Sequence, residues 1–506
     1  MSDVQPPTSR KAAREAAATS RMAATPPPPQ TGEPSGESPR GGPTRLQLGI
    51  IIGAGALVFL LLCTGSVFFG INVGRNSPVQ AGNQAATAPK RVVPGTQIQP
   101  TAIPTCSLDT LASAPALVKL YGSVVDTASG QAVYTKDGTT GVRPAGVMKV
   151  LTAAAAISAL GPTFQITTSV DMTVPGTISL IGQGDATISR LPAGQGVYPG
   201  APTMSTLAAK AFAAYNAIPT NAGTPISNII LDSTYWSPSD SWDSSVPRSR
   251  QTGGYLSEAT ALQVDGDRAN AHNQISPRSN DPVGAAGTAF AQALGALPGG
   301  PNPSSISFTK SATPSGSSAL ASVQSQPVSS LVKQMLRNND DTLAEMLARI
   351  VSVKESLGGG SGSIQQATTT ALAKFTADAS SLTIEDGSGE SDESQVPPQF
   401  MSSFMSLISQ KGNGLQYVAA GLPVAGKSGV LAGRFKGSNA VVSGKITGFS
   451  GAISNASTLT GYLTAADGTG ESFTFFAEGS GSGAAAAALD SLAAAVYTCG
   501  KNITNN

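Results

Sequence analysis

The chain has 506 residues, of which 40% are hydrophobic, so it is long enough to fold into more than one domain around a large core. Its 31 basic residues are nearly balanced by 30 acidic residues, and no long basic run occurs. A net charge of +1 distributed in this way argues against nucleic acid as a partner.

The first 45 residues differ in composition from the rest of the chain. They are rich in Pro, Ser, Gly and Ala and include four consecutive prolines at 26–29. Such a segment cannot bury enough apolar surface to offset the entropy that folding removes. We therefore predict that residues 1–45 form a disordered segment.

Residues 46–74 contain no charged side chain and supply more than the ~20 apolar residues that are needed to span a bilayer. This predicts a transmembrane helix. A cleaved signal peptide is the alternative, but the segment is long and no small-residue cleavage site follows closely. Arg40 and Arg45 before the span, against Arg75 alone just after it, favour a cytoplasmic N-terminus. The expected protein is single-pass in the cell membrane, with its main domain extracytoplasmic.

The three cysteines agree with that placement. Cys63 lies inside the span, while Cys106 and Cys499 lie near the two ends of the outer region. In an oxidising compartment the outer two are natural disulfide partners; two unpaired thiols are the alternative. Closing so large a loop adds on the order of 5 kcal/mol in the chain-entropy model. We therefore expect a folded domain over 106–500, preceded by a flexible stalk at 75–105.

The outer region opens with elements that fit a hairpin followed by a helix. They are a short helix at 108–120, strands at 122–126 and 132–134, and an Ala-rich helix at 147–160 that ends at Gly161-Pro162. This order predicts the start of a sheet with a helix packed against it.

Residues 163–325 alternate strand-like runs with helix candidates, which predicts an inserted subdomain. The runs are strands at 177–181 and 226–232 and helices at 204–216 and 283–294. Helical periodicity returns over 331–353, strands follow near 439–480, and an Ala-rich helix covers 483–497. Because helices and strands come from both ends of the region, we predict an α/β fold in which the two ends form one domain.

One lysine stands in the first turn of the helix at 147–160. A serine at a helix N-terminus and a lysine one turn later share a face and can exchange a proton, which is the chemistry of a Ser-x-x-Lys nucleophile. The lysine of such a pair would be Lys149, but the serine position is Gly146. Lys149 therefore has no hydroxyl to activate.

Further segments occur in a fixed order along the chain: Leu180-Ile181-Gly182-Gln183-Gly184-Asp185, Leu231-Asp232-Ser233 with Ser241-Trp242, 261–268, 386–389 and 422–426. Together with 146–149 they resemble the penicillin-binding protein 4 group, the D-alanyl-D-alanine carboxypeptidases of peptidase family S13, over most of 107–500. The resemblance implies a penicillin-recognising α/β domain, with helices flanking an antiparallel sheet. It also implies an insertion between the first and second active-site motifs, and no cofactor.

The resemblance also implies where the other two motifs fall. A Ser-x-Asn motif, which positions substrate and relays protons, falls at Asn339-Asp340-Asp341. A Lys-Thr-Gly motif, whose lysine binds the terminal carboxylate of the peptide, has two candidates. Lys427-Ser428-Gly429 is right by composition, but it follows 422–426 directly, whereas the family has a longer stretch there. Counting back from the strand at 459–464 favours Phe449-Ser450-Gly451, with the lysine position taken by Phe449.

These departures all weaken acyl transfer. Gly146 cannot form an acyl-enzyme, and loss of a nucleophile typically costs ~10⁴–10⁶ in turnover. Asp341 adds a negative charge where a carboxylate-bearing peptide should lie, and Phe449 removes the matching positive charge. Lys149 and the pair Ser450-Gly451 are what we expect to survive of the cleft.

Other residues offer little replacement chemistry. Ser307 and Lys310 have the spacing of a nucleophile motif, but on an alternating strand pattern they point to opposite faces. Ser330 and Lys333 open a helix and fit an N-cap hydroxyl with a solvated lysine. His272 is the only histidine and stands in a polar run typical of a surface loop. One histidine with dispersed acids predicts no metal site.

The leading hypothesis from the sequence is a catalytically inactive, membrane-anchored relative of these carboxypeptidases. It would bind a peptidoglycan stem peptide or an envelope protein. The alternative from the enzyme class is an active serine-type D-Ala-D-Ala carboxypeptidase that acts in peptidoglycan maturation through an unrecognised nucleophile. A third, weaker option is a structural anchor whose cleft is closed.

Overall fold

The computed structural model describes residues 106–504, with the exception of residue 376. The predicted disordered segment at 1–45, the transmembrane helix at 46–74 and the stalk at 75–105 therefore all lie outside the described residues.

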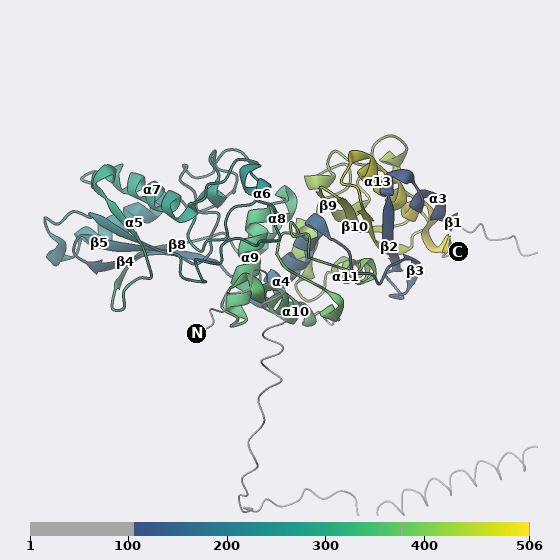
Figure 1. The fold of residues 1–506 in the computed structure, drawn as a ribbon, viewed down its shortest axis with the longest axis horizontal. Helices are drawn as coiled ribbons and strands as arrows, with labels where there is room; N and C mark the ends of the chain where they lie inside the picture. Colours follow the sequence, from purple (N-terminus) through teal and green to yellow (C-terminus); the bar gives the residue numbers. More distant parts are fainter. Residues whose placement is uncertain (1–105, 376, 505–506) are drawn as a thin grey trace, which may run out of the picture. The chain divides into compact units, whose positions relative to one another are not determined.

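The main sheet joins the two ends of the described chain, as the sequence predicts. Its five antiparallel strands follow the order β3-β2-β11-β10-β9. Their bounds are β2 Lys119–Asp126, β3 Ala132–Lys136, β9 Ile446–Ile453, β10 Ala456–Thr464 and β11 Gly470–Glu478. The central strand is β11, and in its pairing with β2 Gly122 lies opposite Phe475. The sheet therefore exists only when the first and last parts of the domain meet (Figure 1).

Helices cover both faces of the main sheet, because successive strand residues point to opposite sides. On one face Phe473 and Phe475 of β11 share a buried cluster with Leu489 and Val496 of helix α13, Gly483–Cys499. On the other face the Ser472 hydroxyl donates to the Ser402 carbonyl of helix α11, Pro398–Gln410.

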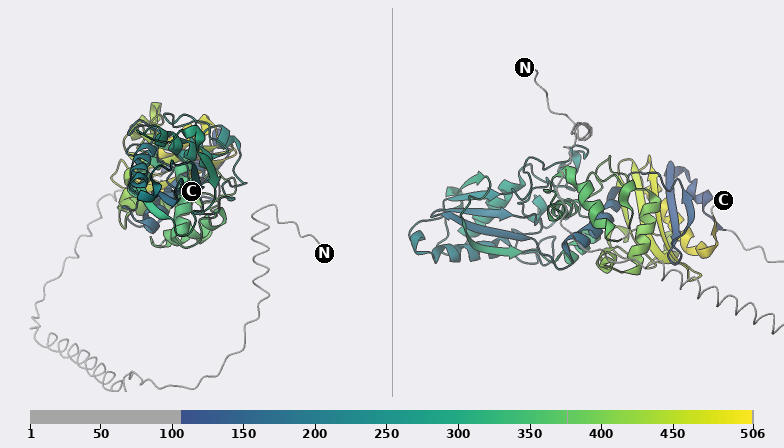
Figure 2. Two further views of the ribbon diagram at one scale, coloured as in Figure 1. Left: turned by 90° about the vertical axis from the view of Figure 1, so that its left-hand side faces the viewer. Right: turned by 90° about the horizontal axis from the view of Figure 1, so that it is seen from below.

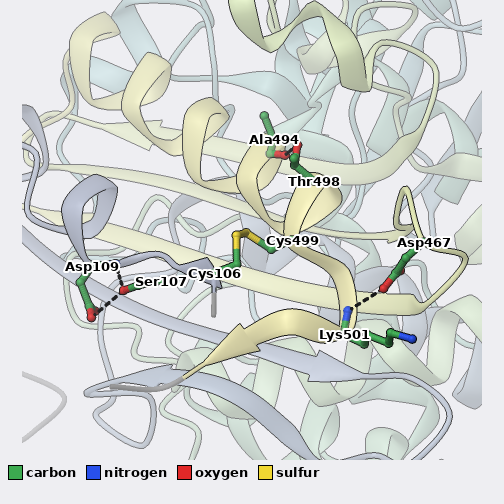
Figure 3. Close-up of a disulfide and its surroundings, with 8 residues drawn as sticks. All are labelled: Cys106, Ser107, Asp109, Asp467, Ala494, Thr498, Cys499 and Lys501. Atoms are coloured by element: carbon green, nitrogen blue, oxygen red, sulfur yellow. Dashed lines mark hydrogen bonds between the residues drawn. A yellow bond between two sulfur atoms is a disulfide. The ribbon is translucent and has the colours of Figure 1, made fainter. Parts of the chain in front are cut away.

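A disulfide fastens α13 to the start of the domain, which confirms the predicted pairing of Cys106 with Cys499 (Figure 3). Next to it, strand β1, Cys106–Ser107, pairs in parallel with β12, Ile503–Thr504. Among the described residues one helical segment, Gly483–Asn502, is long and apolar enough to cross a membrane by length and composition, and half of it is buried inside the domain.

A second sheet occupies the predicted insertion. Its strands follow the order β7-β6-β5-β4-β8 and mix parallel with antiparallel pairs. Their bounds are β4 Thr167–Val174, β5 Thr177–Gly182, β6 Asn228–Asp232, β7 Ser307–Lys310 and β8 Ser318–Gln324. Helices α5, Met204–Asn216, and α7, Pro282–Gly295, pack on it around a separate hydrophobic cluster. Both predicted helices are present, and the side chains of Thr203 and Asp281 cap their N-termini.

A helical layer lies between the two sheets (Figures 1 and 2). It consists of α4 Met148–Leu160, α8 Val328–Asn338, α9 Asp341–Lys354, α10 Ile364–Ala373 and α12 Leu415–Gly421. These helices contribute most of the largest hydrophobic cluster in the described residues. The layer positions α4 and α9, whose first turns carry the candidate site residues.

Two predicted helices are interrupted. The stretch at 331–353 is two helices, because Asn339 adopts a left-handed conformation with φ of 52° and Asp340 caps α9 by accepting the N–H of Leu343. The stretch at 108–120 contains only α3, Asp109–Ala112, a 3-10 turn at Pro115–Leu117 and the start of β2. Pro115 forces the preceding residue out of the helical region and so ends α3.

A carboxyl group without a partner is buried in the main sheet. Glu471 of β11 is 1% exposed, and neither of its carboxyl oxygens has a hydrogen-bond partner among the described residues. Burial raises the pKa of Glu471 to about 8, with the nearby charges of Asp467 and Asp126 adding to the effect. The folded protein therefore holds this group as the neutral acid near neutral pH.

This protonation predicts a pH-dependent stability. The pKa rises from an ordinary 4.5 to about 8 on folding, so over that window the folded state keeps a proton that the unfolded chain releases. The free energy of unfolding should then fall as pH rises from about 4.5 to about 8, by at most about 1.4 kcal/mol per pH unit from this group. Glu471→Gln should remove this contribution. Urea unfolding at several pH values measures this pH dependence, with the exposed Glu393→Gln as control. The prediction is contradicted if the free energy of unfolding of Glu471→Gln falls with pH as steeply as that of the unaltered protein.

Candidate functional site

Three segments that are distant in sequence converge on Gly146. Gly146 is buried in the 3-10 turn Ala145–Val147 (η2), directly before α4. A Cβ placed on it would lie 3.2 Å from Gly451 Cα and 3.4 Å from Phe449 Cε1. Asn339 Oδ1 would lie 3.3 Å from the same Cβ. The structure thus brings together the positions that the sequence assigned to all three motifs.

The contact between β9 and η2 is closer than any side chain allows. A Cβ on Gly451 would lie 2.1 Å from the nitrogen of Gly146, and a Cβ on Gly389 would lie 1.9 Å from the carbonyl oxygen of Ala145. Glycines on both sides of the turn therefore let the backbones touch. Phe449 is fully buried in the same hydrophobic cluster as Val147. The space around Gly146 is filled by backbone and by this ring.

Lys149 is committed to partners inside the protein. Its side chain is 0% exposed, and its Nζ lies 2.6 Å from Asp341 Oδ1. The same nitrogen donates to the carbonyl oxygen of Ser388 at 2.8 Å. Asp341, the first residue of α9, is 2% exposed, so the pair is a buried salt bridge that joins α4 to α9.

The insertion adds a second layer of charge. Arg250 of the short helix α6, Ser249–Thr252, lies 2.6 Å from Glu390 Oε1 and 3.8 Å from Asp341 Oδ2. Burial, followed by the Asp341 charge, raises the pKa of Glu390, while Lys149 and Arg250 oppose that rise. Two basic and two acidic side chains therefore form one cluster, and the Lys149 amine is engaged within it.

A further buried ion pair holds the start of α9 against the insertion. Arg268 Nη2 lies 2.7 Å from Asp340 Oδ2, and the Tyr198 hydroxyl donates to the same oxygen at 2.9 Å. Although burial alone would raise it, Arg268 and Arg278 hold the pKa of Asp340 well below its usual range. Asp340 is thereby kept ionised as the N-cap of α9, and Asp341 is fixed beside Lys149.

The two candidates for the third motif lie in different places. Phe449-Ser450-Gly451 lies on β9 beside Gly146, whereas Lys427 is exposed in the loop that precedes β9. A cation does contact the β9 segment: Arg434 donates to the Ser450 hydroxyl and pairs with Asp490 at 2.8 Å.

Sequence reasoning missed Arg250, Glu390 and Arg434. Of the arginines that form ion pairs around this centre, only Arg268 lies within a segment that the sequence singles out, 261–268. The others carry no local signal, because their roles depend on which distant carboxylate or hydroxyl the fold brings near them.

The alternative nucleophiles remain outside this centre. Ser307 and Lys310 are exposed on β7. The N-cap prediction for Ser330 is wrong: α8 begins at Val328, with no side-chain cap, so Ser330 lies inside its first turn. His272 is exposed, with Nδ1 3.0 Å from the carbonyl oxygen of Gln195. No group of three or more His, Cys, Asp or Glu within the described part of the chain could hold a metal ion.

Comparison with known proteins identifies the family. Residues 105–271 and 223–497 match the model of the D-Ala-D-Ala carboxypeptidase 3 (S13) family. The chain belongs to this family. That confirms the resemblance found in the sequence.

Curated relatives cover almost the whole chain. Carboxypeptidase DacB of Mycolicibacterium smegmatis is 28% identical over 481 residues, which are 90% of this chain and 99% of the relative. Carboxypeptidase Rv3627c of Mycobacterium tuberculosis is 28% identical over 476 residues, 91% of this chain and 99% of the relative.

Solved structures confirm the fold class of this S13 protein. Penicillin binding protein 4 (dacB) from Haemophilus influenzae superposes with a TM-score of 0.62 at 18% identity. The match covers 75% of this chain and 96% of the other. The mixed α/β penicillin-recognising fold predicted from the sequence is therefore correct.

The buried pair in this S13 protein predicts a strong coupling between two residues. Lys149→Met leaves the Asp341 carboxylate with only the more distant Arg250, and Asp341→Asn leaves a buried ammonium without its counterion. Each single variant should lower the free energy of unfolding by about 3–5 kcal/mol. The double variant should cost less than the sum, because it leaves neither charge unpaired.

Urea unfolding of the two single variants and the double variant measures this coupling. The matched control is Lys310→Met, which removes a lysine from an exposed pair with Asp281 and should cost at most about 1 kcal/mol. Additive effects of control size at Lys149 and Asp341 would show that the pair is not coupled.

Proposed function

We propose that this family member does not catalyse acyl transfer and acts in the cell envelope as a binding or scaffolding protein. The observation that carries the proposal is the close packing around Gly146. No side-chain oxygen is present at that position, and Gly451, Asn339 and Phe449 lie within 3.2–3.4 Å of where a Cβ would stand. A peptide carbonyl would have neither a nucleophile nor room beside it.

The buried charges support the same conclusion. The Lys149 amine lies 2.6 Å from Asp341 Oδ1 and donates to the Ser388 carbonyl, so two acceptors inside the protein already engage it. Phe449 at the carboxylate-binding position is an apolar side chain with no exposed surface. A ligand, whether a peptidoglycan stem peptide or an envelope protein, would therefore bind outside this closed centre.

Exposure of the full chain to labelled penicillin tests this proposal. We expect no covalent adduct by mass spectrometry and no release of D-alanine from a peptide that ends in D-Ala-D-Ala. Gly146→Ser should also stay unlabelled, because its Cβ meets Gly451 and Phe449 and Lys149 remains paired. An acylating penicillin-binding protein serves as the positive control. A stoichiometric adduct on any residue of the unaltered chain would establish the competing hypothesis, an active serine carboxypeptidase.

We further propose that residues 46–74 anchor the protein in the cell membrane, with the S13 domain outside the cytoplasm. The uncharged span supports the anchor, and the disulfide between Cys106 and Cys499 fits an oxidising compartment. The full chain should stay with membranes after an alkaline carbonate wash, while a chain that starts at residue 75 should be released. Recovery of the full chain in the wash would contradict the anchor.

A further inference from the structure

We propose that the domain carries a separate binding site for a neutral carbohydrate, in a cavity between the β2–β3 turn and α11. The cavity has a volume of about 670 Å³, within the range of small-molecule sites. Its lining comes from the end of β2, the turn at 127–130, the stretch at 377–381 and the whole length of α11. None of the residues around Gly146 lines it, so this inference stands apart from the proposed function.

Aromatic side chains form one wall of the cavity. The rings of Phe400 and Phe404 are stacked, with centroids 6.0 Å apart and planes inclined by 6°. Phe404 is 1% exposed and forms the base, while Phe400 is half-buried and stands nearer the solvent. Leu407 lies about one turn further along the same face of α11. The axial C–H groups of a pyranose ring present an apolar face that packs well on such a surface.

Amide and hydroxyl groups surround this wall. Gln399, Ser403 and Gln410 come from α11, and Thr127 and Ser129 come from the turn. The side-chain amides of Gln399 and Gln410 make no hydrogen bond within the described chain. Each amide can donate and accept, which matches the hydroxyl and acetamido groups at the edge of a sugar.

The charge of the lining selects against other ligands. It contains no lysine, arginine or histidine, so a phosphate or the free carboxylate of a stem peptide would find no cation there. Asp378 is its one acidic residue, and hydrogen bonds from Ser380 lower the pKa of that carboxyl. A single carboxylate among neutral groups is an acceptor for sugar hydroxyls. The ligand that fits is therefore neutral, apolar on one face and rich in hydroxyl groups.

The test uses the full chain in lipid nanodiscs and, as probe, the linear β-1,4-linked tetramer of N-acetylglucosamine. Isothermal titration calorimetry should show saturable binding. Phe400→Ala should weaken the affinity by about tenfold, because it removes the stacking surface. Gln410→Ala should weaken it by about three- to tenfold. Gln366→Ala, an exposed glutamine on α10 outside the cavity, should leave it unchanged.

Gln410 is exposed, so its variant keeps the test valid even if Phe400→Ala unfolds. Absence of saturable binding, equal affinities for all four proteins, or displacement of the tetramer by a D-Ala-D-Ala pentapeptide through the same residues would overturn the proposal. The penicillin experiment examines the Gly146 centre alone, so failure of one proposal is distinguishable from failure of the other.

Discussion

The contact of strand β9 with the turn before α4 is the constraint on which the centre of this domain depends. Gly146 and Gly451 meet backbone to backbone, at a separation that leaves no room for a Cβ on Gly451. This approach buries Phe449 in the same cluster as Val147 and places its ring beside Gly146. Gly451 is the residue that permits this approach, because a Cβ there would lie 2.1 Å from the nitrogen of Gly146.

The retained lysine has a physical explanation that requires no catalysis. Lys149, Asp341, Arg250 and Glu390 come from α4, α9, the insertion and the segment after α10, and they form one buried cluster. Removing one member of such a cluster leaves an uncompensated charge, which is more destabilising than removing a matched pair. The same side chain that would serve a serine nucleophile therefore fastens three parts of the fold together.

Much of this fold follows from local signals in the sequence. Thr203 and the Pro282 position mark the helices of the insertion, and the alternating apolar runs mark its strands. The break at Asn339 was missed because helical periodicity continues across it, although Asn339 is left-handed and Asp340 caps the next helix. Arg250, which the insertion also contributes to the centre, could not be identified from the sequence. The ion-pair partner of an arginine is set by tertiary structure rather than by its neighbours in sequence.

The strand order places the Gly146 centre and the cavity at opposite edges of the main sheet. β9, which closes the Gly146 centre, and β3, which shares a turn with β2 at the cavity, are the two edges of the main sheet. The cavity depends on that turn and on the outer face of α11, whose inner face packs on β2 and β11. Changes at β9 therefore leave the walls of the cavity in place. Because α11 must stay fixed to cover the sheet, the stacked phenylalanines keep their geometry whether or not the acyl-transfer centre is functional.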